Sequence, residues 1–182
     1  MGNTATNVST GKPNISGAVF AAPIGTTLPT DATTALDNAF VCLGYVSEDG
    51  LTNNNEMDVS TIKAWGGAIV YRSLTELDDN FALTLIESEN IDVLKAVYGD
   101  ANVTTANDTT KVEVIAEDPQ EKVWVFELAL RGGKAKRIVI PDGAVTAREA
   151  ITYNDSDAIG YGITVSAYPD ANGKTHIEYL ED

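Results

Sequence analysis

Short segments with the pattern of β-strands recur along this chain of 182 residues, and they limit its possible folds more than any other feature. One of them covers residues 80–88. Its Phe81, Leu83 and Leu85 alternate with smaller or polar residues, as in a strand with one buried face. Further strands are predicted in the ranges 17–23, 40–46, 61–72, 111–118, 121–130, 134–141, 160–169 and 175–180. The fold class is therefore predicted to be mainly β, as a β-sandwich or partial barrel.

One segment has helical periodicity instead. Ile91, Leu94 and Val97 recur at a spacing of three residues, which is typical of an amphipathic helix. Ser88 is the predicted N-terminal cap and Gly99 the predicted end of the helix. A helix of about ten residues is unstable alone, so we expect a single α-helix flanking the strands.

A polar, acidic segment separates two of the predicted strands and is predicted to form a projecting loop over residues 46–61. We expect the loop to contact a neighbouring copy of the chain, although an ordinary solvated loop is the alternative. The candidate contact residues on it are Glu48, Asp49, Asn53, Asn54, Asn55, Glu56 and Asp58. The basic residues Lys134, Lys136 and Arg137 are the candidate partners of these side chains on the neighbour.

Trp65 follows this segment and is predicted to anchor the base of the loop in the core. The adjacent Gly66 and Gly67 would allow close approach of the backbone. At the other end of the chain, residues 1–16 are polar and lack periodicity, so they are predicted to form an N-terminal arm outside a single domain of residues 17–182. Such an arm should be disordered in a lone monomer, so an ordered arm would indicate a neighbouring chain.

The net charge of −15, from 27 acidic and 12 basic residues, limits the possible partners. A chain this acidic is a poor general binder of nucleic acid or of anionic membranes. The charge favours either solubility or the repulsion of a polyanion. There is also no run of about 18 apolar residues, so no membrane insertion is expected.

The residues needed for common active sites are scarce. Cys42 is the only cysteine and lies in an apolar run, where a small core residue is expected, and His176 is the only histidine. The turn sequences in the ranges 154–157 and 170–173 contain oxygen ligands, but turn formation explains them without calcium. We therefore predict a protein that is not an enzyme and that has no metal site and no cofactor.

Four segments of the chain resemble a known family. They are "APIGTTLPTDA" (Ala22–Ala32), "LGYVSEDGLT" (Leu43–Thr52), "IKAWGG" (Ile62–Gly67) and "FALTLIESENIDVLKAVYG" (Phe81–Gly99). In this order they resemble the major tail tube proteins of bacteriophages with long, non-contractile tails, most closely those of phages that infect actinobacteria. The resemblance covers residues 17–100.

The resemblance implies both a fold and a function. It implies a β-sandwich with a flanking helix, six copies in a ring, inner strands that join into one ring-wide β-barrel, and rings that stack into a tube. Double-stranded DNA would pass through an acidic lumen without specific binding. Glu127 is a candidate lumen residue because it alternates with Trp124 and Phe126.

The implied partners are other copies of the chain and the tape-measure, tail-terminator and distal tail proteins. The implied location is the phage virion, after assembly in the host cytoplasm. Some relatives carry an immunoglobulin-like C-terminal domain, and none is expected here. The alternatives are a subunit of a contractile or non-viral injection tube, and a monomeric β-sandwich binding module.

Overall fold

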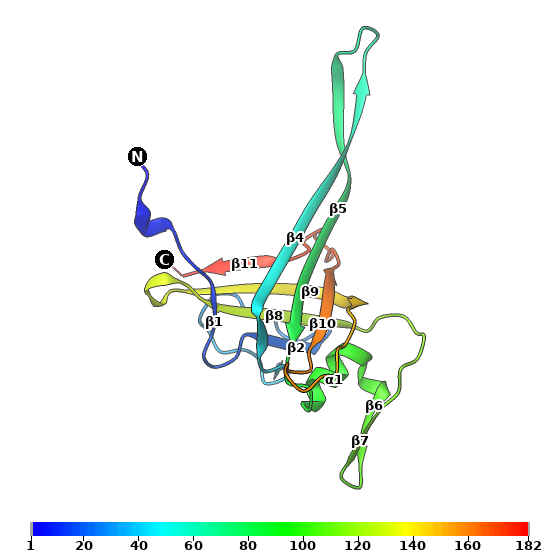
Figure 1. Ribbon diagram of the computed structural model, residues 1–182. Helices are drawn as coiled ribbons and strands as arrows, with labels where there is room; N and C mark the ends of the chain where they lie inside the picture. The colour runs from blue at the N-terminus through cyan, green and yellow to red at the C-terminus, as the bar shows by residue number, and fades with distance from the viewer. Residues whose placement is uncertain (1, 182) are drawn as a thin grey trace.

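The computed structural model describes residues 2–181, and its main element is a nine-stranded antiparallel sheet (Figure 1). The strand order is β3-β2-β8-β9-β10-β5-β4, with β1 paired to β8 and β11 paired to β9. The bounds are β1 Lys12–Pro13, β2 Val19–Pro23, β3 Val41–Cys42, β4 Val46–Lys63, β5 Ile69–Leu85, β8 Glu121–Ala129, β9 Ala135–Arg148, β10 Tyr161–Ala167 and β11 Ile177–Leu180. The predicted mainly β class is confirmed.

The sheet folds over itself to enclose the core. In Figure 1, β8 and β9 run across β4, β5 and β10, so the two parts of the sheet form two layers. Trp124 and Phe126 on β8 are buried between the layers, and the ring of Phe126 stacks on that of Phe81 at 5.5 Å between centroids. The predicted alternation of buried residues at Phe81, Leu83 and Leu85 is confirmed.

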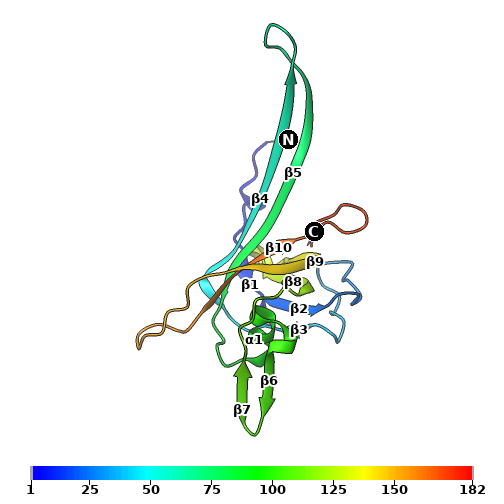
Figure 2. The ribbon, with the colours of Figure 1, turned by 90° about the vertical axis from the view of Figure 1, so that its right-hand side faces the viewer.

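The helix α1 (Ile91–Tyr98) packs against this core. Gly99 ends it with a φ of 96°, as predicted. The N-terminal cap is Asn90 rather than Ser88, because the Asn90 side chain accepts a hydrogen bond from the backbone N–H of Asp92 at 3.0 Å. A small hairpin of β6 (Val103–Ala106) and β7 (Thr109–Val112) follows and extends away from the body on the helix side (Figure 2).

The predicted loop over residues 46–61 is a strand, so that prediction was wrong. It belongs to β4, which pairs with β5 to form a long hairpin that rises from the body in both views (Figures 1 and 2). Most of this hairpin lies outside the core, so its side chains need not be apolar. Pairing with β5 satisfies the backbone hydrogen-bonding groups of β4, whatever its side chains are. The polar sequence Asn53–Asn55 can therefore form a strand, and it pairs in register with Asp79–Phe81.

The prediction for Trp65 was also wrong. The predicted strand over residues 61–72 turns back at Ala64–Ala68, which forms the tip of the hairpin. Trp65 therefore lies at the tip, with an exposed fraction of 107 %, and not in the core.

Part of the N-terminal arm belongs to the sheet of its own chain. Lys12 and Pro13 pair with Ala129 and Leu128 of β8. The Ser9 hydroxyl also accepts a hydrogen bond from the backbone N–H of Arg131 at 2.8 Å. Contacts within one chain therefore attach this part of the arm to the body, and a contact of the arm with a neighbouring chain stays a prediction.

Candidate functional site

The residues that could support catalysis lie apart from one another. Cys42 is exposed on β3, and its predicted place in the core was wrong because β3 is a two-residue strand at the edge of the sheet. His176 contacts Asp79 instead of a thiol. Within residues 2–181, no cluster of three or more His, Cys, Asp or Glu side chains is arranged to hold a metal ion. Cys42 on β3 and His176 beside Asp79 are therefore parts of different environments in the fold.

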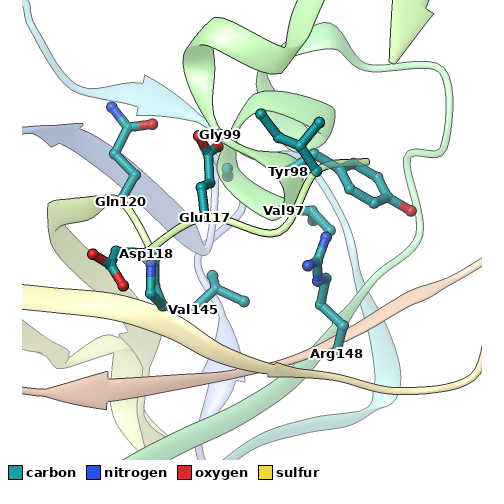
Figure 3. Close-up of a pocket in the computed structure, with 11 residues that line it drawn as sticks. Val97, Tyr98, Gly99, Glu117, Asp118, Gln120, Val145 and Arg148 are labelled. Carbon is teal, nitrogen blue, oxygen red and sulfur yellow. The ribbon is translucent and has the colours of Figure 1, made fainter. Parts of the chain in front are cut away.

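A small pocket lies beside α1, between the end of the helix and the loop around Glu117 (Figure 3). The Arg148 guanidinium lies 5.2 Å from the centre of the Tyr98 ring, and burial raises the pKa of Tyr98. The Asn102 amide donates hydrogen bonds to the backbone oxygen of Tyr98 at 2.7 Å and to the Glu117 carboxylate. These contacts have a structural role, because they attach the segment around Glu117 to the end of the helix.

The β4–β5 hairpin is the main feature without a partner. Pairing between β5 and β10 ends at Asn80 and Ser166, and beyond this point only two strands remain. An isolated two-stranded hairpin is marginally stable in water. This hairpin nevertheless continues to its tip at residues 64–68, so its surface is suited to contact another chain.

One face of the hairpin is apolar. Met57 lies opposite Leu77, and Val59 lies opposite Leu74, on the side that continues the buried face of Phe81. The exposed fractions of Met57, Val59, Leu74 and Leu77 are 65 %, 51 %, 56 % and 38 %. We call these four residues the apolar face. Contiguous apolar surface of this kind is typical of protein interfaces.

The opposite face of the hairpin is acidic. Glu56 lies opposite Asp78, and Asp58 lies opposite Glu76, so two pairs of like charges face each other across the strands. We call these four residues the acidic face. Directly opposed like charges destabilise a strand pair, so this arrangement costs the isolated hairpin stability. It continues the outer face of the sheet, where residues are small or polar, such as Ala82 and Thr164.

A buried carboxylate fixes the root of the hairpin. The Asp79 side chain is fully buried, accepts a hydrogen bond from the Asn53 amide at 2.9 Å, and lies 2.5 Å from Nδ1 of His176. Burial favours the neutral acid, but hydrogen bonds from Thr175, Asn53, His176 and Asn55 outweigh it and lower the pKa of Asp79. Asp79 therefore joins β5 to β4 and to the segment before β11.

Glu127 and Arg137 form a buried ion pair, and both predictions for them were wrong. They lie opposite each other in the β8–β9 register, with 2.5 Å between Arg137 Nη2 and Glu127 Oε1. The Arg137 side chain is 4 % exposed and the Glu127 side chain 12 % exposed. Arg137 also donates a hydrogen bond to the backbone oxygen of Asp31 at 2.7 Å. Neither side chain is free for a neighbouring chain or an open lumen surface.

The structure brings four of the predicted contact residues around one groove: Glu48, Asp49, Asn53 and Lys136. Glu48 and Asp49 lie on its rim, in a bulge of β4 that shifts the register between Val46 and Leu51. Lys136 lies on the same rim, 2.9 Å from Glu178. The remaining ones lie elsewhere: Asn54, Asn55, Glu56 and Asp58 further along β4, and Lys134 at the exposed turn between β8 and β9.

Sequence reasoning missed the groove itself and the apolar face. The groove is lined by apolar side chains from several strands, including Leu51, Phe126, Leu128 and Ile138. The apolar face depends on the β4–β5 register, which places Met57 beside Leu77 although 20 positions separate them. A period-two pattern through Met57 and Val59 was the available signal for a strand.

Comparison with known families gives a match over nearly the whole chain. The family model described as "Phage tail tube protein" matches residues 5–182. No curated protein matches the chain. Over residues 2–181 the structure contains no helix that is both long enough and apolar enough to cross a membrane.

Proposed function

Because the chain belongs to the phage tail tube protein family and is a structural subunit of a bacteriophage tail tube, we propose that six copies close into a ring, that rings stack, and that genomic DNA passes through the lumen into the host. The observation that carries this proposal is the β4–β5 hairpin. It extends beyond the sheet with one apolar and one acidic face, and a monomer leaves both in water.

The open sheet supports ring closure. The strand order ends at β3 and β4, the short strands β1 and β11 each pair with one strand only, and β4 presents an unpaired edge along its length. Long exposed edges promote uncontrolled association unless they are covered or paired. Pairing between the sheets of neighbouring copies would remove these edges and join the inner strands into one barrel around the ring.

The acidic face replaces Glu127 as the candidate lumen surface. Its carboxylates Glu56, Asp58, Glu76 and Asp78 are exposed, and they lie on the outer side of the sheet, opposite the core. A lumen lined by carboxylates repels the phosphate backbone, so DNA would slide without binding. This position also gives the opposed like charges a function that offsets their cost to the hairpin.

A tube of this kind needs further partners. At its ends and in its lumen these would be the tail-terminator, distal tail and tape-measure proteins, and the location would be the virion after assembly in the host cytoplasm. A contractile or non-viral injection tube would use the same surfaces. A monomeric binding module is disfavoured, because it would leave the apolar face uncovered.

Electron microscopy of the purified protein over a range of concentrations tests the proposal. Hexameric rings and stacked tubes with a central hole are the expected result. A protein that stays monomeric at high concentration, with no rings under any condition, would contradict it. A variant lacking residues 56–78 is a useful second sample, because the body keeps its core while the apolar face is removed.

A further inference from the structure

The tip of the hairpin presents a rigid aromatic side chain. Among the large apolar residues of the described chain, Trp65 has the highest exposed fraction, 107 %. The backbone beneath it is fixed, because the Ala64 N–H donates to Ala68 O at 2.7 Å and the Gly67 N–H donates to Ala64 O at 2.9 Å. A large aromatic group on a preorganised turn is typical of an interface anchor.

The tip also differs in charge from the rest of the molecule. Residues 59–75 include Lys63 and Arg72 and contain no acidic residue, in a chain whose net charge is −15. The apolar side chains Ile62, Ile69 and Tyr71 are also exposed there. The tip is therefore apolar and basic, and its complement would be an apolar surface with an acidic rim.

The groove on the body has this complementary character. Its apolar lining includes Leu51, Leu128 and Ile138. Its rim carries the exposed carboxylates Glu48 and Asp49, besides Lys136, which is paired with Glu178. The groove opens beside the bulge in β4, so it reaches the core between β4 and the β8–β9 layer.

An unsatisfied polar atom also lines the groove. The Ser47 Oγ is buried and has no hydrogen-bond partner among the described residues. A buried hydroxyl without a partner is costly.

We infer that Trp65 of one copy docks into this groove on a copy in the next ring, with Lys63 and Arg72 against Glu48 and Asp49. The inference rests on the proposed stacking of rings, and this contact would be the one that joins one ring to the next. The occupant is a second copy of this chain, because tip and groove complement each other in polarity and charge.

The length of the hairpin is consistent with this contact. Leu51 lines the groove at the root, and the 14 residues from there to Trp65 span about 45 Å as a strand. If the tip of each copy contacts the root of the next, successive copies are separated by about that length along the tube. Each hairpin would then run beside the body of the next copy and bury the apolar face of the hairpin there. If the tip instead contacted only the end of the next body that carries α1, the apolar face would stay in water.

Disulfide trapping tests the contact directly. In a Cys42→Ser background, which removes the only native thiol, Ala64→Cys is combined with Asp49→Cys. Oxidation should give a ladder of covalent multimers for the double-cysteine protein and almost none for either single-cysteine control. Tubes that form without such a ladder would overturn the inference.

Charge reversal provides an independent test. Lys63→Glu with Arg72→Glu should leave rings that do not stack, and Glu48→Lys with Asp49→Lys should do the same. All four changes in one chain should restore tubes, since the complementarity is restored. If the fourfold variant stays unstacked while both pairs fold normally, or if either pair alone stacks like the unmodified protein, the inference is wrong.

Substitution of the anchor completes the set. Trp65→Ala should lower stacking more than about tenfold, as for a side chain that dominates an interface. Trp65→Phe should recover part of it, and Tyr153→Ala, at an exposed aromatic residue on the body, is the matched control. A cross-linked ladder without rings would support the docking of Trp65 but contradict the hexameric ring. The two proposals can therefore be refuted separately.

Discussion

The carboxylate of Asp79 lies 2.5 Å from Nδ1 of His176, at the point where the β4–β5 hairpin leaves the body. These two residues are 97 positions apart in the chain and join the root of the hairpin to the segment before the last strand. The direction of the hairpin therefore depends on a buried polar contact.

We predict that this contact makes the free energy of unfolding decrease as the pH becomes acidic. The pKa of Asp79 is lowered in the folded protein, so its contribution is present above the unfolded value, which is near 3.8, and is lost as the pH falls through the folded value. Asp79→Asn should lower the free energy of unfolding by about 1–3 kcal/mol at pH 7. Urea unfolding at pH 7 and pH 3 measures this, and an equal deficit at both values would contradict the prediction.

Glu127→Lys should impair folding rather than passage of DNA. It places a second cation beside Arg137, whose side chain is 4 % exposed, and loss of one member of a buried ion pair typically costs about 3–5 kcal/mol. Thermal unfolding should show a clear decrease in melting temperature. The matched control is Glu121→Lys, an exposed position on the same strand, where the melting temperature should change little. A stable Glu127→Lys protein with a normal melting temperature would argue against this role.

Leu74→Ser with Leu77→Ser should abolish tube formation without unfolding the body. Both side chains belong to the exposed apolar face, so their removal costs the monomer little buried area. Analytical ultracentrifugation gives the assembly state, and circular dichroism tests the fold. Ser60→Ala with Ser73→Ala, a pair on the opposite face, is the control and should assemble normally.

Replacing acids of the acidic face should affect DNA passage more than assembly. Glu56→Lys with Asp58→Lys also removes two pairs of opposed like charges, so the hairpin should become slightly more stable, by about 0.2–1 kcal/mol for each pair. Attractive contacts to phosphates should then slow ejection, and more so at low salt. Ejection rates of phage particles that carry the variant measure the effect, and unchanged rates at low salt would refute the lumen assignment.

The sequence predicted the regular, buried part of the fold well. Alternation at Phe81, Leu83 and Leu85, and the helix ending at Gly99, are consequences of burial on one face, and burial leaves a periodic pattern. The hairpin could not be recognised in this way, because few of its distal side chains enter the core. Trp65 was misjudged for the same reason, since a large aromatic residue is usually buried unless an interface requires it.

Some of the missed contacts had a signal in the sequence. Glu127 and Arg137 lie in the predicted strands 121–130 and 134–141, five positions on either side of Gly132. A hairpin centred on that glycine would place them opposite each other. A second signal was Asn107-Asp108, where both residues have positive φ, 50° and 59°, in the turn of the β6–β7 hairpin. The groove left no such signal, because its lining comes from six separate strands.

The hairpin extends from one side of the body only, with α1 and the β6–β7 hairpin on the other side (Figures 1 and 2). Any polymer in which all copies point the same way is therefore polar, with two unlike ends. One end shows free hairpins and the other shows bodies that no hairpin has reached. A protein that binds one end through the free hairpins would therefore find no matching surface at the other end.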